Sequence, residues 1–378
     1  MQMGRVRTGI VGYGKVAHTH AEALALLPES EFTAVCGRDL ERARAFAGQY
    51  GVQAYASVGE MIERGRVEAI VVCTPHPAHA APVVAAARMG VHTLVEKPLA
   101  ASLADCDAMI SAAREGCVRL GVISQRRLYE PVQRVKAAID AGKIGEPMLG
   151  MILMLGWRDE AYYRSDPWRG SWEFEGGGVL VNQAPHQLDL LQWFMGPIEE
   201  LFGYWDNLNH PTIEVEDTAV AVLRFGNGGL GTIVVSNSQK PGIFGKVHVH
   251  GSNGASVGVQ TDGGAMFIAG MTSVLEPPIN DLWTVSGEEA ILPDWQEQDR
   301  LAFSAIDATR HYHILQDQDF LRAILEDRDP MIPGEEGRKT VELFTAIYRS
   351  QRDRAPVRFP LDAEDGSHDF DGRLGSSV

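Results

Sequence analysis

The chain has 378 residues, of which 45% are hydrophobic and 22% are charged, and its formal net charge at pH 7 is −16. This length can fill two or three hydrophobic cores, and the composition is that of a soluble globular protein. Because nucleic acids and anionic membranes repel a negative surface, neither is expected as a partner, and a small molecule is favoured. The sequence contains no apolar run long enough to span a bilayer and no recognisable leader, which predicts a cytoplasmic protein.

Short apolar runs alternate with helix-forming stretches in the first third of the chain. The helical stretches include His18–Leu27, Leu40–Tyr50 and His79–Met89. Strand and helix in alternation predict βαβ units and a doubly wound parallel sheet within an α/β domain over residues 1–123. The predicted strands are Arg7–Val11, Phe32–Cys36, Ala69–Cys73, Thr93–Val95 and Arg119–Ile123.

Strand composition returns in a different arrangement after Gly145, with Gly-Asn and Gly-Ser turn signals between the runs. This pattern predicts a second α/β domain over residues 124–361, built on a large, mostly antiparallel open sheet. Asp299–Leu325 and Pro333–Ser350 are predicted as two helices, and residues 362–378 have the composition of a disordered tail. The predicted strands are Met148–Leu155, Val215–Phe225, Gly229–Ser236 and Lys246–His250.

A glycine-rich turn follows the first predicted strand and opens the first helix. Its glycines permit a tight turn and the close approach of a pyrophosphate, which the N–H groups of a helix N-terminus stabilise. A turn between any strand and helix can produce the same pattern, but the βαβ context favours a dinucleotide site. The residues of this site are Gly12, Tyr13, Gly14, Lys15 and Val16.

About 20 residues after such glycines, an acid normally binds the ribose 2′-hydroxyl. Here Gly37 occupies that position, Arg38 is beside it, and Arg42 lies one helical turn further on. Guanidinium groups without a carboxylate favour a 2′-phosphate, which predicts NADP over NAD. In the alternative interpretation, Asp39 binds the ribose and Arg38 is a solvated surface residue.

Two further segments follow predicted strands, at the sheet edge where doubly wound folds bind their ligands. CTPHPAH supplies Thr74, Pro75, His76 and His79, and HTLVEKPLA supplies Glu96 and Lys97. A lysine at a strand end, followed by a rigid proline, is a positioned cation near the reacting groups of a bound dinucleotide. The alternative is an exposed loop lysine.

Six segments together resemble the glucose-fructose oxidoreductase, inositol dehydrogenase and rhizopine-catabolism (Gfo/Idh/MocA) family of NAD(P)-dependent oxidoreductases. The resemblance implies an N-terminal Rossmann domain, and a C-terminal α/β domain whose open sheet often forms the interface of a homodimer or homotetramer. It also implies hydride transfer at carbinol carbons of sugars and cyclitols. The segments are GIVGYGKVA, CTPHPAH, VEKPLA, QRRLYEPVQRVKAAIDAGKIGEP, EGGGVLVNQAPHQLDLLQW and PGEEGRKTVELFTAIYRSQRDRAPVRFP.

The resemblance implies roles for single residues. The lysine of the family's E-K-P matches Lys97, and the catalytic histidine of G-G-x-x-x-D-x-x-x-H-x-x-D matches His186. The final acid of that motif matches Asp189, whereas Asn182 replaces its first aspartate; we count Asn182 with the catalytic residues. One helix over Val181–Phe194 would place all three on one face, unless Pro185 delays or bends it.

Alcohol oxidation needs a base for the hydroxyl proton, and imidazole suits this step because its pKa lies near working pH. A lysine can stabilise the developing alkoxide. Aromatic faces with arginine and tyrosine donors suit pyranose rings, although the same aromatic insert could be an arm packed on a neighbouring subunit. The predicted substrate-binding residues are Arg126, Tyr129, Arg158, Tyr163, Trp168, Arg169, Asn182, His186 and Asp189.

The leading hypothesis is therefore an NAD(P)-dependent dehydrogenase of a sugar, glycoside or cyclitol. A second hypothesis is a cis-dihydrodiol dehydrogenase of aromatic catabolism, because NQAPHQLD is similar to the variant motif of some such family members. A third is a catalytically silent dinucleotide sensor, which the presence of Lys97 and His186 disfavours. No metal site is expected, since the cysteines are far apart and His248 and His250, which alternate on one predicted strand face, have no carboxylate or cysteine at ligand spacing.

Overall fold

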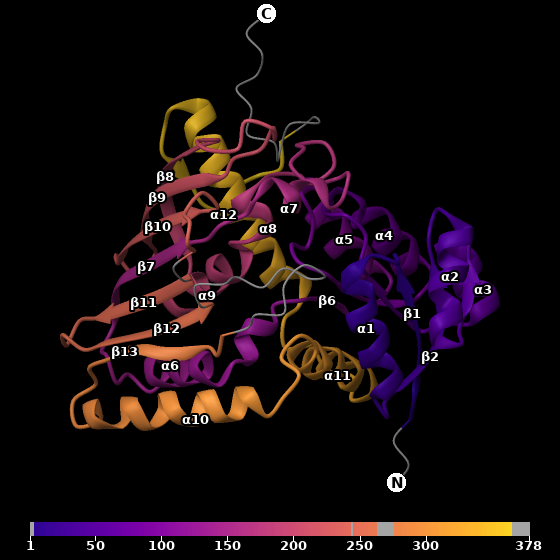
Figure 1. Ribbon diagram of the computed structural model, residues 1–378, viewed down its shortest axis with the longest axis horizontal. Helices are drawn as coiled ribbons and strands as arrows, with labels where there is room; N and C mark the ends of the chain where they lie inside the picture. Colours follow the sequence, from indigo (N-terminus) through magenta and orange to yellow (C-terminus); the bar gives the residue numbers. More distant parts are fainter. Residues whose placement is uncertain (1–3, 243–244, 263–275, 365–378) are drawn as a thin grey trace, which may run out of the picture. The chain divides into compact units, whose positions relative to one another are not determined.

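A computed structural model describes residues 4–242, 245–262 and 276–364 of the protein (Figure 1). The chain divides into two compact units. One unit comprises Met1–Gln125 and Thr309–Arg338, and the other comprises Arg126–Ala308 and Lys339–Val378. The first boundary lies close to the predicted one, but residues 309–338, which the sequence assigned to the second domain, belong to the first unit. Residues 365–378 of the predicted tail lie outside the described ranges.

The first unit contains a six-stranded sheet in the order β3-β2-β1-β4-β5-β6, and every neighbouring pair is parallel. Strand β4 is buried along its whole length, as is usual where helices cover both faces of a parallel sheet. The predicted doubly wound sheet is confirmed. Its strands are β1 (Val6–Val11), β2 (Ser30–Cys36), β3 (Gln53–Tyr55), β4 (Ala69–Val72), β5 (His92–Val95) and β6 (Leu120–Val122).

The helices of this unit include one from far along the chain. Phe320 and Leu321 of α11 (His311–Leu325) belong to the same buried core as Ile10 and Leu94 of the sheet. The predicted single helix over Asp299–Leu325 is wrong, because the chain breaks after α10 (Leu292–Ser304) and the two helices lie in different units. The other helices are α1 (Lys15–Leu26), α2 (Leu40–Tyr50), α3 (Val58–Gly65), α4 (Ala80–Arg88) and α5 (Leu103–Glu115).

The second unit contains an eight-stranded sheet in the order β13-β12-β11-β7-β10-β9-β8-β14. Only β7 and β10 pair in parallel among its described strands, which confirms the predicted mostly antiparallel sheet. The sequence did not predict β8, β12, β13 or β14. The strands are β7 (Pro147–Leu155), β8 (Ile198–Asp206), β9 (Thr218–Phe225), β10 (Leu230–Ser236), β11 (Gly245–Gly251), β12 (Ser256–Asp262), β13 (Ile279–Trp283) and β14 (Val357–Arg358).

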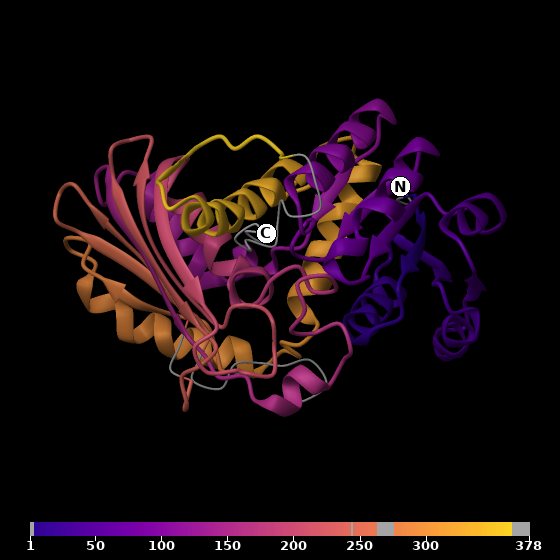
Figure 2. The same ribbon diagram turned by 90° about the horizontal axis from the view of Figure 1, so that it is seen from above.

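Helices pack on one face of this second sheet. A Cβ at Gly150 of β7 would meet Leu191 and Met195 of α9, and the Gly203 N–H of β8 donates to Ser350 of α12. Strand register places both glycines on one face, and Figure 2 shows α12 along it. The helices of the second unit are α6 (Glu130–Asp140), α7 (Glu160–Arg164), α8 (Val179–Asn182), α9 (Pro185–Met195), α10 and α12 (Gly334–Asp353). Helix α12 crosses the boundary between the two units.

The opposite face of the second sheet carries exposed apolar side chains. Register places alternate residues of β7, β10, β9 and β8 on this face. None of the described helices combines the length and apolar character needed to cross a membrane. The exposed residues of this outer face are Leu149, Met151, Leu153, Tyr204, Val220, Val222 and Leu230.

Candidate active site

The turn between β1 and α1 has the geometry that a pyrophosphate requires. Gly12 has φ = 111°, and a Cβ there would lie 2.8 Å from the carbonyl oxygen of Cys73. Gly14 is the N-cap of α1, where no side chain caps the helix and the first turn contains no acid. The N-terminal N–H groups of α1 thus lie in a region that favours an anion, and these residues fit a bound dinucleotide.

Gly37 is needed for a different reason from the one that the spacing suggested. A Cβ at Gly37 would lie 2.1 Å from the Tyr13 ring, and the Arg42 guanidinium lies over that ring, 4.8 Å from its centroid. Arg38 is exposed. One oxygen of Asp39 accepts from the N–H groups of Glu41 and Arg42, at 3.0 and 3.1 Å, and so caps α2.

His79 holds two loops of the first unit together. Its Nδ1 lies 3.0 Å from the Pro98 carbonyl oxygen and 3.2 Å from that of Leu99, and its Nε2 lies 2.8 Å from the Thr74 carbonyl oxygen. The side chain is fully buried. The structure therefore gives His79 a supporting position, whereas the sequence placed it among residues that touch the cofactor. Thr74 and Pro75 are half-buried and His76 is buried.

Glu96 and Lys97 follow β5 directly. The Glu96 side chain is buried, with Oε1 3.1 Å from His20 Nε2 and Oε2 accepting from the Lys97 N–H at 3.1 Å. The other ring nitrogen of His20 lies next to Asp317 of α11, 297 residues along the chain. Sequence patterns missed His20 and Asp317, because no short motif joins residues so far apart.

His20, Glu96 and His313 bring three potential metal ligands together, which the sequence did not predict. Their ligand atoms lie within 4.8 Å of one another. Among the described residues, this is the one such group of histidine, cysteine and acidic side chains.

In the second unit, the glycines before His186 pack against a buried carboxylate. A Cβ at Gly178 would lie 1.8 Å from the Glu216 carbonyl oxygen. The Glu216 side chain accepts from the N–H groups of Gly178 and Leu180, at 2.9 and 3.0 Å, and from the Tyr348 hydroxyl at 2.9 Å. Burial raises the pKa of Glu216 to about 7, although these hydrogen bonds act in the opposite direction and lower it. The sequence missed Glu216, since nothing local marks it.

The chain does not form one helix over Val181–Phe194: the helix that carries His186 starts late, at Pro185, which is one of the alternatives that the sequence left open. Helix α8 ends at Asn182, and α9 begins at Pro185, which lacks an N–H group and is suited to the first helical turn. The Asn182 amide donates to the Glu175 carboxylate and, at 3.1 Å, to the Tyr162 hydroxyl. Asn182 is therefore engaged by a carboxylate that the sequence had not singled out.

His186 and Asp189 are both buried on α9. The Arg127 guanidinium donates to both Asp189 oxygens, at 2.6 and 2.8 Å. Nothing in the sequence motif pointed to Arg127, because the segment around it was recognised only as part of a longer match. The Arg127–Asp189 ion pair anchors α9 to the segment before α6.

The aromatic insert forms a polar network within the second unit. The Tyr162 hydroxyl accepts from Arg169 at 2.5 Å and from Gln183 at 2.8 Å, and burial raises the pKa of Tyr162 to about 12. Arg169 also lies over the Trp168 ring, 4.5 Å from its centroid. Arg158 and Tyr163, which belong to the same segment, are buried. Arg126 and Tyr129 are half-buried, and Arg126 Nη1 donates to the Thr261 hydroxyl at 3.3 Å.

The parallel sheet, its glycine turn and the similarity of the chain to known proteins define an NAD(P)-dependent oxidoreductase. Residues 6–124 match the model described as the oxidoreductase family with an NAD-binding Rossmann fold, and residues 132–257 match the Gfo/Idh/MocA C-terminal domain. The chain belongs to the Gfo/Idh/MocA family, as its motifs predicted.

Three relatives illustrate this similarity. The chain is 27% identical over 358 residues to the myo-inositol 2-dehydrogenase of Thermotoga maritima, covering 93% of this chain and 98% of the relative. It is 28% identical over 236 residues to a 1-carboxy-3-chloro-3,4-dihydroxycyclo hexa-1,5-diene dehydrogenase of Comamonas testosteroni, covering 61% and 58%. The WlbA dehydrogenase of Bordetella pertussis, solved with NADH and UDP-GlcNAcA, superimposes with a TM-score of 0.84 at 29% identity, covering 96% and 100%.

Proposed function

We propose that the protein transfers a hydride between a nicotinamide cofactor and a secondary alcohol or ketone of a sugar, glycoside or cyclitol. The observation that carries this proposal is the position of Lys97, directly after β5 in the dinucleotide-binding unit, where its backbone N–H donates to the Glu96 carboxylate. The similarity to a myo-inositol dehydrogenase, and to an enzyme solved with UDP-GlcNAcA, supports a polyhydroxylated substrate.

The bound nicotinamide supplies the hydride acceptor or donor. In the oxidation direction, His186 takes the proton of the substrate hydroxyl, and the Lys97 ammonium stabilises the developing alkoxide. Asn182 holds the Glu175 carboxylate and the Tyr162 hydroxyl, so it orders the chain just before α9. The proposed substrate contacts are Arg126, Tyr129, Arg158, Tyr163, Trp168, Arg169 and Asp189.

Replacement of Lys97 tests the proposal. Lys97→Met should lower kcat about a hundredfold or more while the KM of the dinucleotide stays within about threefold, because the lost charge acts mainly in the transition state. Absorbance of the reduced nicotinamide measures turnover on a panel of pyranosides, inositols and cis-dihydrodiols. Lys143→Met, which removes a lysine paired with Glu288, is the matched control. Near-wild-type turnover of Lys97→Met on its best substrate would reject the assignment.

The cis-dihydrodiol dehydrogenase remains the second candidate, supported by the NQAPHQLD segment and by the similarity to the Comamonas enzyme. The same panel separates the two functions, since a cyclitol enzyme should oxidise inositols and leave the dihydrodiols unchanged.

NADP is proposed as the preferred cofactor. The exposed Arg38, beside Gly37, can bind a 2′-phosphate through charge-assisted hydrogen bonds, and no carboxylate occupies position 37. Asp39 keeps one oxygen on the N-cap of α2, and an NAD-binding role would use its other oxygen. The ratio of kcat/KM for NADP and NAD, measured for the wild type and Arg38→Ala, distinguishes the two roles.

The outer face of the second unit's sheet is proposed as the interface of a homodimer or homotetramer. Its seven exposed apolar side chains form a continuous set across four strands, and burying such a set is favourable. Sedimentation of the purified protein tests this.

The four cysteines are free thiols, which supports the proposed cytoplasmic location.

A further inference from the structure

A buried chain of charged groups lies next to Lys97 in the first unit. The Nδ1 of His20, on α1, lies 3.0 and 2.9 Å from the two carboxylate oxygens of Asp317, on α11. The Nε2 of the same ring lies 3.1 Å from Glu96 Oε1. The exposed fractions of His20, Asp317 and Glu96 are 0%, 1% and 7%. Three elements far apart in sequence thus meet at one imidazole ring.

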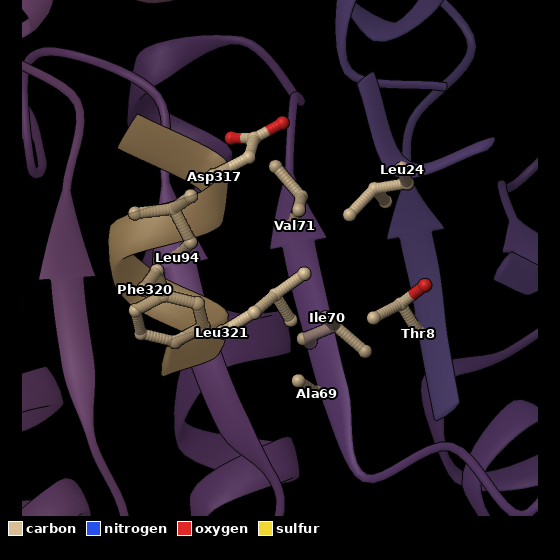
Figure 3. A pocket seen from close by; sticks show the side chains of 9 residues that line it. All are labelled: Thr8, Leu24, Ala69, Ile70, Val71, Leu94, Asp317, Phe320 and Leu321. Atoms are coloured by element: carbon tan, nitrogen blue, oxygen red, sulfur yellow. The ribbon is translucent and has the colours of Figure 1, made fainter. Parts of the chain in front are cut away.

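The surroundings of Asp317 make a strong partner necessary. Figure 3 shows the Asp317 carboxylate at one end of a small pocket whose other walls include the apolar side chains of Val71, Leu94 and Phe320. A carboxylate next to such walls loses its hydration and is stable only when it is paired and hydrogen-bonded. His20 is the partner that the geometry supplies.

The geometry favours a protonated His20. When Asp317 and Glu96 are both ionised, their oxygens only accept hydrogen bonds, so each ring nitrogen donates and the ring is an imidazolium. Burial opposes this charge, but Asp317 and Glu96 outweigh it and raise the pKa of His20 to about 10. Burial likewise opposes the charge of Glu96, while the bonds to His20 and His313 bring the pKa of Glu96 well below 4.5.

Two further groups face the same carboxylates. His313, also on α11, has its Nε2 3.7 Å from Glu96 Oε1 and lies edge-on to the His20 ring. Cys73, which follows β4, is buried, and burial with the charges of Glu96 and Asp317 raises the pKa of its thiol well above 9. Cys73 therefore stays neutral and does not compete for the imidazolium.

The chain of charges ends at the backbone of Lys97. Glu96 uses one oxygen for His20 and the other for the Lys97 N–H, so its carboxylate is fixed at both ends. On the other side of Lys97, His79 lies within hydrogen-bond distance of the Pro98 and Leu99 carbonyl oxygens. We propose, resting on the function proposed for Lys97, that His20 is a positioning residue: held between Asp317 and Glu96, it fixes the carboxylate that aims Lys97.

A metal ion is the competing occupant of this cluster. It would bind His20 Nε2, Glu96 and His313, with Asp317 orienting His20 from behind. A metal ligand must be unprotonated, however, and His20 Nε2 already faces Glu96 at hydrogen-bond distance. The charges of the cluster favour a proton at this position.

Asp317→Asn tests the proposal, with Asp319→Asn as the matched control on the same helix. Asp319 pairs with Arg328 at 2.9 Å and is not part of the cluster. In Asp317→Asn we expect kcat to fall about tenfold and the KM of the dinucleotide to stay within about twofold, because only the aim of Lys97 changes. The loss should deepen as pH rises through neutrality, since His20 then loses its proton nearer to its ordinary pKa of 6.5. The proposal would be overturned if Asp317→Asn and Asp319→Asn changed kcat equally and neither lost further activity as pH rose.

A measurement on the wild type removes the dependence on variant folding and on activity. Nitrogen-15 histidine NMR at pH 8 should show a ring signal with both nitrogens protonated that vanishes in His20→Gln. A neutral His20 ring at pH 8, or a stoichiometric metal found by elemental analysis and lost in His20→Gln, would overturn the proposal. If no alcohol in the panel is oxidised, the proposed function fails, while the NMR result still decides the state of His20.

Discussion

Two buried glutamates support the segments that carry the proposed catalytic residues, and they do so with opposite electrostatics. In the first unit, Glu96 lies against the His20 imidazole, and its pKa is held well below 4.5. In the second unit, Glu216 accepts hydrogen bonds from two backbone N–H groups and a phenol, and burial raises its pKa to about 7.

The comparison shows what decides the charge of a buried carboxylate. Both side chains accept several hydrogen bonds, and both are almost fully buried. Dipoles lower the cost of desolvation only in part, whereas a full positive charge at contact distance exceeds it. The first region is therefore an ionic support, and the second is a support that changes charge near neutral pH.

The largest expected effect comes from removing the two charges in turn. Glu96→Gln should lower the free energy of unfolding at pH 7 by about 3–5 kcal/mol, because it breaks a buried ionic contact. Glu216→Gln should cost about 1–2 kcal/mol, since one amide oxygen still accepts while the other contacts are lost. Urea unfolding at pH 7 measures both values. Equal losses would mean that the two glutamates have the same charge state.

The pH dependence of stability should separate the two regions further. The pKa of Glu216 is raised from 4.5 to about 7, so its contribution is complete below pH 4.5 and is lost as pH rises to 7. This loss amounts to about 3 kcal/mol at most and should be absent in Glu216→Gln. Glu96 acts in the opposite sense, since a lowered pKa stabilises above pH 4.5 and the contribution is lost as pH falls. Urea unfolding of the wild type and of Glu216→Gln between pH 4.5 and 7 measures how the free energy of unfolding depends on pH.

A new acid at the half-buried position 182 would sharpen the comparison. Asn182→Asp places a second carboxylate beside Glu175 and removes the amide that donates to it. We expect a loss of about 2 kcal/mol at pH 8 and a smaller loss at pH 5, where the two acids can share one proton. Thermal unfolding at both pH values measures this. Asn182→Gln, which keeps the amide, is the control, and an identical loss at both pH values would contradict the explanation.

The activity of Asn182→Asp bears on an expectation from the sequence. If Asn182 and His186 are in contact, the new carboxylate should move the rising limb of kcat/KM to higher pH, because it favours the imidazolium. The break between α8 and α9, together with the bonds from Asn182 to Glu175 and Tyr162, favours an unmoved limb.

The sequence by itself determined the type of each sheet, one parallel and one mostly antiparallel, and the positions of the cofactor motifs. Strand β1, the glycine turn and helix α1 follow from local rules, since apolar runs, glycine φ angles and helix formers act within a few residues. The same rules placed Lys97 directly after a buried strand. At Pro185 they left open whether the helix runs through or starts late, and the structure shows the late start, which the missing N–H of proline favours.

Only the tertiary structure decided which side chains support those motifs. Asp317 reaches His20 across 297 residues, because α11 packs its apolar face on the parallel sheet and carries the acid with it. Glu216 meets Gly178 because the chain returns to the start of α8 just before β9. Neither contact has a local signal: a buried carboxylate is specified by the partners that surround it in space, and sequence periodicity reports only which side of an element faces inward.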